Sequence, residues 1–307
     1  MRNTQWIQYV IPTLLKNSQI THLISPYHQT PLFLDRSIKS ITIIHDICGI
    51  LPSAGYQYYK KGPYRHWFNF LTSLIRADGL VYVSKHTKTK FEQLFPFVKK
   101  RPSKICYSKP TIAANKDYNE FMNLLEVLGI KYKEYYFAYG SPGIRKGTDI
   151  VLESFVEYKN EGGEKDLILL TSKSNVMYFE KLIEEIKFPI NIITNLTNKE
   201  RDAVYYGATA LIFPSRCEGF GLPILEAMHL GCPPIALKNS PANEIIGGCV
   251  PELEELNRDE IVKLMFFYDY QEEKFQKLME KKLELRAAEF LEKIEIGKEY
   301  LELINSL

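Results

Sequence analysis

The 307-residue sequence predicts an α/β protein with two halves, each built on a parallel sheet covered by helices. Short apolar runs without polar alternation alternate with longer amphipathic segments, a pattern typical of strands buried on both faces of a parallel sheet. Glycine-containing turns follow several of these runs, and an open α/β sheet binds its ligands at such turns. Together these observations predict two Rossmann-like domains facing across a cleft.

The expected strands are short and lie at similar positions in the two halves. They occupy residues 20–26, 40–44, 79–83 and 104–107, then 134–139, 166–171, 190–193 and 210–213. We expect domains at 1–125 and 126–285, followed by a C-terminal helix over 286–307.

Composition is ordinary for a globular protein, with 45% hydrophobic and 25% charged residues. No apolar run approaches the roughly 18 residues that a membrane span needs. The N-terminus also lacks the apolar core of a signal peptide. Five cysteines, an odd number without any C-x-x-C pair, predict reduced thiols and a cytoplasmic protein.

Charge divides the chain. Residues 1–125 carry 17 Lys and Arg against 6 Asp and Glu, whereas residues 126–307 carry 22 against 31. A basic half suits nucleic acid, an anionic membrane surface or a phosphorylated acceptor. A solvated basic face without any partner is the alternative. Nucleic acid is not expected, because no recognised binding module accompanies the basic residues.

The strand at 40–44 delivers His45 and Asp46 at its carboxyl end, where α/β proteins place functional groups. His45 can donate to or accept from a sugar hydroxyl, and Asp46 can either fix its tautomer or cap the next turn. A purely structural role for the pair is the alternative. Farther along, Ser84 and Thr87 follow the third strand and open a helix as caps.

Residues 51–70 mix aromatic side chains with bases. Such a segment can lie in a lipid interface or grip a sugar-rich acceptor. It can equally be a helix that packs its aromatic residues inward. The sequence leaves both interpretations open.

In the second half, the turn at 140–147 carries Arg145 and Lys146 between a strand and a helix at 148–159. Arginine binds phosphate oxygens bidentately and lysine supplies a point charge, so the pair suits a diphosphate. A solvated basic turn is the alternative.

The stretch at 208–248 organises the rest of the chain. Its strand is followed by a glycine-spaced turn, and a helix then starts at Leu222 with proline next, where a missing N–H costs nothing. The helix should end near Leu230, before a glycine and two prolines. The amides of Gly219, Phe220, Gly221 and Leu222 therefore lie at a helix N-terminus, which favours an anion such as phosphate.

Two glutamates border this turn, Glu218 within it and Glu226 eight positions later. Carboxylates accept well from paired sugar hydroxyls, so the two can hold different parts of one ligand. The alternative is a surface residue at 218 and a helix-start glutamate at 226 that the helix dipole favours.

The string at 218–228, EGFGLPILEAM, resembles the E-x7-E motif of the retaining glycosyltransferases of family 4. The similarity continues through residues 231–236 and 241–245, and a weaker likeness covers about residues 5–250. This family has the two-domain GT-B fold and uses nucleotide sugars. The resemblance implies that the helix at 286–307 packs back on the first domain. The length of the match makes the signal specific.

The resemblance implies a role for each candidate residue. His45 and Glu218 would face the donor sugar, and Glu226 would bind the ribose. Leu196 lies in a loop similar to the one that contacts the nucleobase. Arg145, Lys146 and the amides of residues 219–222 would neutralise the leaving diphosphate. Ser141 stands where many members have an arginine, so Arg145 must supply that charge.

The function implied is transfer of a sugar from a UDP- or GDP-sugar to a hydroxyl of a cell-surface glycan or lipid-linked precursor, with retention of configuration. No cofactor or metal is expected, because the chain contains no D-x-D motif. The basic half predicts a cytoplasmic enzyme at the anionic inner membrane face. The rival hypothesis is a non-catalytic glycosyltransferase-like partner subunit.

Relative to the family, the first domain is shortened. Members usually begin with a strand and a glycine-rich loop beside the donor phosphates, and neither has a counterpart here. A trimmed acceptor domain, a truncated chain and a partner chain that completes the domain are the three explanations. The sequence does not choose among them.

Overall fold

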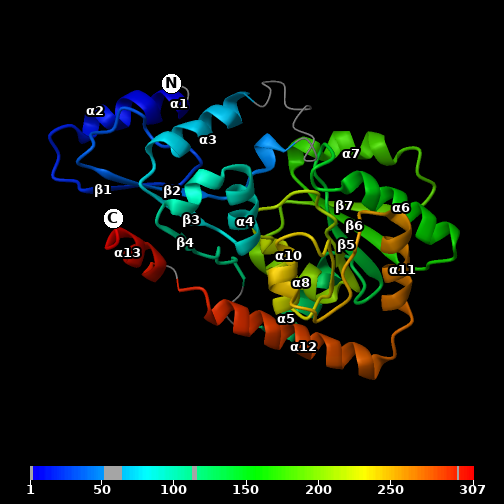
Figure 1. Ribbon diagram of the computed structural model, residues 1–307. Helices are drawn as coiled ribbons and strands as arrows, with labels where there is room; N and C mark the ends of the chain where they lie inside the picture. The colour runs from blue at the N-terminus through cyan, green and yellow to red at the C-terminus, as the bar shows by residue number, and fades with distance from the viewer. Residues whose placement is uncertain (1–2, 52–63, 113–115, 296) are drawn as a thin grey trace. The chain divides into compact units, whose positions relative to one another are not determined.

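The computed structural model describes residues 3–51, 64–112, 116–295 and 297–307. The chain forms two compact units, each with a parallel sheet (Figure 1). The first unit comprises Met1–Ser108, Cys217–Phe220 and Ile294–Leu307, and the second comprises Lys109–Arg216 and Gly221–Lys293. The predicted α/β class with parallel sheets is confirmed.

The first unit has a four-stranded sheet in the order β1-β2-β3-β4. Its strands are β1 (His22–Ser25), β2 (Lys39–Ile44), β3 (Gly79–Tyr82) and β4 (Ser103–Ile105). Its helices are α1 (Asn3–Gln5), the π-helical turn η1 (Trp6–Val10), α2 (Ile11–Leu15), α3 (Tyr64–Arg76), α4 (Lys85–Leu94) and α13 (Lys298–Ile304), with 3-10 turns at Cys48–Ile50 and Pro96–Lys100.

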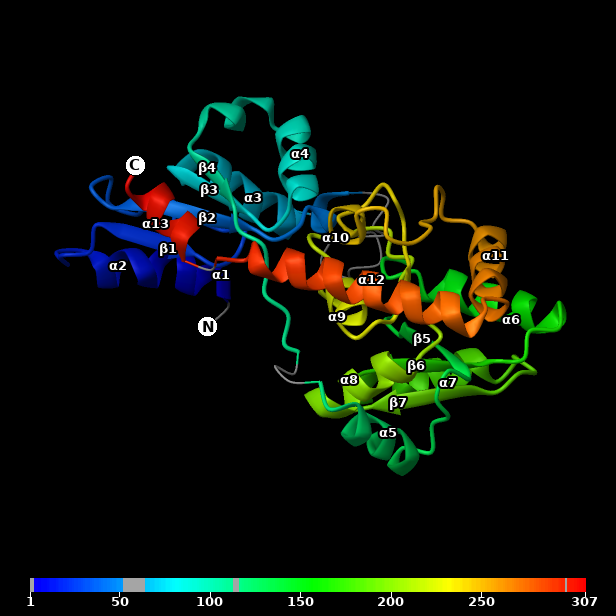
Figure 2. The ribbon, with the colours of Figure 1, turned by 90° about the horizontal axis from the view of Figure 1, so that it is seen from below.

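Alternate residues of the central strands face two separate cores. Ile44 and Leu80 pack with Phe70 of α3 and Phe91 of α4 on one face of the sheet. On the other face, Ile41 and Val81 pack with Cys106 and with Leu303 of α13. Figure 2 shows α13 beside the first sheet.

The second unit has a five-stranded sheet in the order β7-β6-β5-β8-β9. Its strands are β5 (Tyr135–Tyr139), β6 (Asp166–Thr171), β7 (Ile190–Thr194), β8 (Ala210–Ile212) and β9 (Pro234–Ile235). Its helices are α5 (Tyr118–Val127), α6 (Thr148–Asn160), α7 (Val176–Ile183), α8 (Asn198–Gly207), α9 (Leu222–His229), α10 (Ala242–Ile246), α11 (Arg258–Asp269) and α12 (Glu273–Glu292), with a 3-10 turn at Lys173–Asn175.

The strand order of the second sheet reverses beside β5. The chain runs outward from β5 to β6 and β7, and then returns to the other side of β5 with β8. Ligands of open α/β sheets bind at the carboxyl ends of the strands at such a reversal. The loops that follow β5 and β8 are therefore where a ligand of this unit is expected.

The boundary between the units lies after Ser108, whereas the sequence places it after residue 125. The difference comes from α5, which packs against α8 of the second unit. The rings of Phe121 and Tyr206 lie 5.7 Å apart. The expected C-terminal helix over 286–307 is instead the end of α12 followed by the separate helix α13.

The expectation that all five cysteines are reduced is wrong for two of them. Cys48 and Cys217 form a disulfide across 169 positions of sequence, and Cys106, Cys232 and Cys249 are free. Neither an odd number of cysteines nor the lack of a C-x-x-C pair reports a pairing so distant in sequence, because tertiary folding alone brings the two residues together.

Within the described ranges, no helix is both long and apolar enough to cross a membrane.

Candidate functional site

The loop after β5 is built around two small residues. The hydroxyl of Thr148, at the start of α6, accepts from the amide of Ser141 at 3.1 Å and so ties the two ends of the loop together. Gly147 has a φ of 73°, and a Cβ there would clash with the carbonyl oxygen of Pro214. Only glycine therefore lets this loop approach the loop that follows β8.

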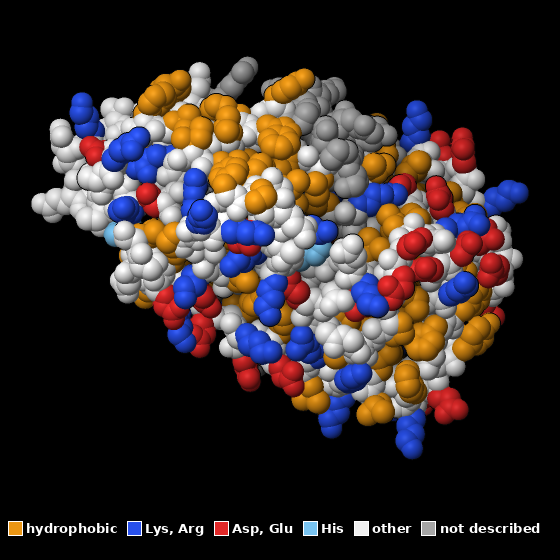
Figure 3. Space-filling view, in the orientation of Figure 1, with side chains coloured by type: hydrophobic (Ala, Val, Ile, Leu, Met, Phe, Trp, Pro, Cys, Tyr) orange, Lys and Arg blue, Asp and Glu red, His pale blue; other side chains and the backbone are white. Residues whose placement is uncertain are grey.

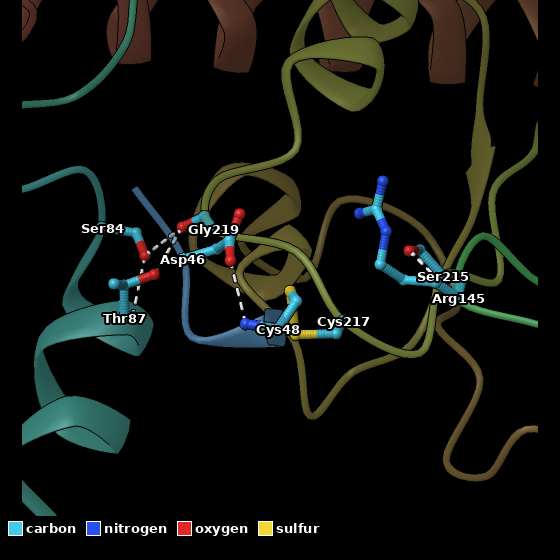
Figure 4. The surroundings of a disulfide bond; sticks show 8 residues. All are labelled: Asp46, Cys48, Ser84, Thr87, Arg145, Ser215, Cys217 and Gly219. Carbon is cyan, nitrogen blue, oxygen red and sulfur yellow. Dashed lines mark hydrogen bonds between the residues drawn. A yellow bond between two sulfur atoms is a disulfide. The ribbon is translucent and has the colours of Figure 1, made fainter. Parts of the chain in front are cut away.

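Both predicted cations lie on the loop after β5, at the strand-order reversal. The carbonyl of Arg145 accepts from the Ser215 hydroxyl at 3.1 Å and from the Arg216 amide at 2.8 Å. Figure 4 shows the Arg145 side chain extending from the loop beside Ser215. The ammonium of Lys146 lies 5.1 Å from the centre of the Phe213 ring. The two cations are thus held on a backbone that hydrogen bonds fix.

A third cation, Arg216, has a structural role that sequence reasoning missed. Its guanidinium donates two hydrogen bonds of 2.8 Å to the carboxylate of Asp149, in the first turn of α6, and a further bond to the carbonyl of Ile144. A bidentate pair of this kind fixes geometry as well as charge. Arg216 therefore holds the loop that carries Arg145 and Lys146.

Helix α9 begins and ends close to where the sequence predicts. Gly221, at φ 107°, is its N-cap, the helix runs from Leu222 to His229, and Gly231 follows at φ 74°. At its start Pro223 has no N–H and the Ile224 amide donates to the Gly221 carbonyl at 3.0 Å, so it is the helix dipole that favours an anion here.

Glu226 is buried, with 7% of its surface exposed, and faces helix α8. The Tyr205 hydroxyl donates to its carboxylate at 3.1 Å, and the guanidinium of Arg201 lies 3.9 Å away. Burial raises the pKa of the Glu226 carboxyl, although the charge of Arg201 opposes the shift. Neither Arg201 nor Tyr205 was predicted as a partner of Glu226. The two residues are four positions apart on the helix that Thr197 caps, so the sequence does indicate that they lie on one side of it.

Leu196 lies half-buried in the short loop between β7 and α8. The predicted capping box is present, because Thr197 accepts from the Glu200 amide at 3.2 Å and Glu200 accepts from the Thr197 amide at 2.7 Å. Asn195, at φ 54°, makes the turn before it. The loop that carries Leu196 therefore has a defined conformation.

In the first unit, His45 and Asp46 follow β2 as predicted. The Nε2 atom of His45 lies 2.7 Å from the carbonyl oxygen of Pro26. Asp46 accepts from the Cys48 amide at 2.9 Å. Asp46 therefore caps the turn after β2, which is one of the two roles expected for it.

The segment Cys217–Phe220 lies against that turn. The hydroxyls of Ser84 and Thr87 both donate to the Gly219 carbonyl, at 2.6 and 2.8 Å, and the disulfide anchors Cys217 to Cys48 (Figure 4). A Cβ at Gly219 would clash with the His45 carbonyl oxygen. The half-buried Glu218 therefore sits between two anchored neighbours.

His28 is another residue that sequence reasoning missed. Its ring is packed against Phe70 at 4.8 Å and meets the His45 ring edge-on at 5.9 Å. Burial lowers the pKa of His28 to about 4, so the ring beside His45 is neutral at physiological pH. Only its position after β1, at the same sheet edge as His45, could have indicated it.

The structure therefore distributes the predicted site residues over both units. The first unit holds His45, Glu218, Gly219 and Phe220, and the second holds Arg145, Lys146, Leu196, Gly221, Leu222 and Glu226. Within the described part of the chain, no group of three or more His, Cys, Asp and Glu residues could hold a metal ion.

Most of the second unit matches a known family model. Residues 123–250 match the family described as glycosyl transferases group 1. The match contains the loops after β5 and β8 and helix α9.

Two curated relatives agree with this match. The chain is 30% identical over 173 residues to a probable sucrose-phosphate synthase of Thermosipho melanesiensis, covering 52% of the chain and 38% of the relative. It is 24% identical over 234 residues to the O-antigen chain mannosyltransferase B of Escherichia coli, covering 72% and 59%. The chain thus spans about two fifths to three fifths of these relatives.

Solved structures show the same fold. WaaG, a glycosyltransferase involved in lipopolysaccharide biosynthesis, matches with a TM-score of 0.65 and 15% identity over 99% of this chain and 81% of its own. The sucrose-phosphate synthase of Thermosynechococcus elongatus matches with a TM-score of 0.70 and 16% identity, over 100% of this chain and 81% of its own. Anabaena HepE, solved with UDP and glucose, matches with a TM-score of 0.69 and 16% identity, over 88% of this chain and 72% of its own. These likenesses show a shared GT-B fold, and the family match together with the two curated relatives supports a group 1 glycosyltransferase.

Proposed function

We propose that this protein is a retaining glycosyltransferase that transfers a sugar from a UDP- or GDP-sugar to a hydroxyl acceptor. The observation that carries the proposal is the set of groups at the strand-order reversal of the second unit. Cations of the loop after β5, the N-terminus of α9 and the buried Glu226 all belong to the elements around β5 and β8. A nucleoside diphosphate needs these three kinds of contact.

In this proposal the diphosphate lies against Arg145, Lys146 and the backbone amides of residues 219–222. These groups stabilise the negative charge that develops on the leaving phosphate oxygen. Glu226 accepts from the ribose hydroxyls, with its carboxylate oriented by Tyr205 and Arg201. Leu196 contacts the nucleobase.

The configuration at the anomeric carbon is retained if the acceptor attacks that carbon from the side on which the diphosphate leaves. The acceptor oxygen then bonds to the anomeric carbon as the bond from that carbon to the phosphate oxygen breaks, and the departing phosphate takes the acceptor proton. His45 and Glu218 hold the hydroxyls of the donor sugar. The proposal assigns no step to a metal, in keeping with the absence of a D-x-D motif in the sequence.

For the acceptor, we propose a cell-surface glycan or lipid-linked precursor presented at the inner membrane face. The basic composition of residues 1–125 supports an anionic partner for the first unit. Two similar proteins, an O-antigen chain mannosyltransferase and a glycosyltransferase involved in lipopolysaccharide biosynthesis, are consistent with polysaccharide assembly.

The test is calorimetric binding of UDP, GDP and ADP to the wild type and to Lys146→Ala. Loss of a charge-assisted phosphate contact should weaken binding of the preferred nucleotide by about ten- to a hundredfold. Lys274→Ala, which removes an exposed lysine from α12, is the matched control and should bind as the wild type does. Equal affinity in Lys146→Ala and the wild type would remove Lys146 from the donor site.

Turnover is tested on the same protein. Incubation with UDP- and GDP-sugars should release nucleoside diphosphate, and the anomeric configuration of the product, read by NMR, should match that of the donor. Nucleotide binding without turnover of any donor would favour the non-catalytic partner subunit instead.

A further inference from the structure

The turn after β1 and the turn after β2 lie beside each other in the first unit. The two strands are parallel neighbours, with Ser25 paired to Thr42, so their carboxyl ends meet at one edge of the sheet. Pro26 and His28 follow β1, and His45 follows β2. The turn after β1 is therefore the nearest neighbour of the residue proposed to hold the donor sugar.

One hydrogen bond between these turns decides which nitrogen of His45 carries the proton. The Nε2 atom lies 2.7 Å from the Pro26 carbonyl oxygen, and a carbonyl oxygen can only accept. In the neutral ring Nε2 is therefore protonated, and Nδ1 is left as an acceptor. In this form His45 can accept from a sugar hydroxyl, whereas the opposite tautomer would turn an unprotonated Nε2 toward the carbonyl.

The turn after β1 is anchored to helix α3. The Ser73 hydroxyl donates to the His28 carbonyl at 2.8 Å, and the Thr30 amide donates to the Thr72 hydroxyl at 3.2 Å. Ser73, Thr30 and Thr72 are fully buried, so water does not compete for these bonds. The backbone of this turn, including the carbonyl that orients His45, is therefore fixed.

The ring of His28 contacts both α3 and His45. It packs on Phe70 with the ring centres 4.8 Å apart, and it meets the His45 ring edge-on at 5.9 Å. Edge-on ring pairs at such distances attract each other in a defined geometry. The Nδ1 atom of His28 is buried and has no hydrogen-bond partner among the described residues, so packing holds this ring. Burial lowers the pKa of His28 to about 4, and the ring therefore brings no positive charge next to His45.

Helix α3 supports His28 with one of its sides. Phe70 and Ser73 contact His28, whereas Leu71 and Ile75 lie on the exposed side, among the hydrophobic side chains over α3 in Figure 3. Phe70 belongs to the core of the unit, where side chains are closely packed in one arrangement. The His28 ring thus rests on the packed interior and not on the solvent-facing side of the helix.

We propose that His28 is a positioning residue for sugar transfer. Its ring keeps the His45 imidazole in the orientation in which Nε2 donates to Pro26 and Nδ1 accepts from a hydroxyl of the donor sugar. His28 acts through His45 and does not itself bind the substrate. The inference rests on the proposed function, which supplies the sugar hydroxyl as the partner of His45.

The first test is the nitrogen NMR spectrum of the histidine side chains in the full chain, without ligand. His45→Gln identifies the His45 signals. The wild type should show His45 protonated at Nε2, and in His28→Ala the ring should populate both tautomers. A wild-type His45 protonated at Nδ1 overturns the proposal without the use of any His28 variant. Unchanged His45 signals in His28→Ala overturn it as well.

The second test is donor turnover. Loss of the oriented contact in His28→Ala should lower kcat/KM for the nucleotide sugar about tenfold. The affinity for free UDP or GDP should not change, because the proposed nucleotide contacts lie in the second unit. His28→Phe restores a neutral ring of similar shape and should recover both the His45 signals and the turnover.

The matched control is His22→Ala. His22 is a half-buried histidine at the opposite end of β1, where its Nδ1 atom lies 2.9 Å from the hydroxyl of the adjacent Thr21. This variant should match the wild type in the His45 signals and in turnover. An equal loss of turnover in His22→Ala and His28→Ala would overturn a specific role for His28.

The remaining outcomes separate the inference from its alternatives. If His28→Phe restores the His45 signals but not turnover, an imidazole nitrogen is required, and His28 is a substrate-binding residue instead. A lower thermal midpoint of His28→Ala with unchanged kcat/KM would make its role purely structural. Absence of turnover by the wild type would overturn the proposed function alone, because the NMR test needs no donor.

Discussion

At the scale of single residues, lack of space requires glycine at position 219, next to Glu218. Gly219 has its carbonyl held by two hydroxyls, and its Cα faces the His45 carbonyl oxygen with no room for a methyl group. No positive φ is involved, so the requirement for glycine is purely steric. The ring of Phe220, the next residue, lies 5.7 Å from that of Tyr107 and is tilted by 35° to it.

Gly219→Ala should therefore destabilise the protein more than an ordinary glycine replacement. Overpacking against backbone should cost about 1 to 3 kcal/mol, measured by chemical denaturation. Gly129→Ala is the control, because Gly129 has a φ of 68° and open space around it. Its cost should be limited to backbone strain, about 1 kcal/mol. A smaller loss at Gly219 than at Gly129 would contradict the steric explanation.

At the scale of elements, helices α8 and α9 together make the Glu226 cluster. Arg201 and Tyr205 lie one turn apart on α8, and the Tyr205 hydroxyl also lies 2.8 Å from that of Tyr139 on β5. Three elements thus converge on one buried carboxylate. Burial raises the pKa of Glu226, so its ionised form costs folding free energy that Arg201 and Tyr205 only partly offset.

Glu226→Gln should weaken nucleoside diphosphate binding at pH 7 by about tenfold, because a charged acceptor of the ribose hydroxyls is lost. The same substitution should raise the free energy of unfolding at pH 7. The folded pKa is raised, so the wild type loses stability as the pH rises from the unfolded value through the folded one, while glutamine does not ionise.

The measurement is the thermal midpoint of both proteins from pH 4 upward, alongside calorimetry at pH 7. The advantage of Glu226→Gln should grow as the pH rises from the unfolded pKa to the raised folded pKa, and it should disappear below the unfolded value, where the carboxyl is neutral in both states. A variant that is less stable at every pH would show that the Tyr205 and Arg201 contacts outweigh the cost of burying the charge.

At the scale of the whole molecule, the disulfide between Cys48 and Cys217 closes a loop of 169 positions. It connects the turn after β2 with the segment that carries Glu218. Long loops lose the most entropy in the unfolded chain when they are closed.

Reduction with dithiothreitol should therefore lower the free energy of unfolding by about 2 to 5 kcal/mol. Cys48→Ser with Cys217→Ser should have the stability of the reduced wild type, with or without reductant. Cys249→Ser, which removes a free cysteine, should respond to reductant as the wild type does. Identical denaturation curves for oxidised and reduced wild type would contradict a stabilising role for the bond.

The sequence by itself determined the α/β class, most strand positions, the start of α9 and the capping box at Thr197. Each depends on neighbours within a few residues, where periodicity and cap chemistry act. The place of His45 after β2 and of the cations after β5 follows from the same local order.

Only the tertiary structure decided the contacts between distant segments. The disulfide, the bidentate pair of Arg216 with Asp149, the clamp on Gly219 and the partners of Glu226 join residues from 21 to 169 positions apart. The exposure of Leu71 and Ile75 on α3 became evident in the same way, because the sequence of an apolar helix does not show which of its sides the core covers. Local sequence carries no record of which elements pack together, and that packing decides which side chains are buried, paired or left exposed.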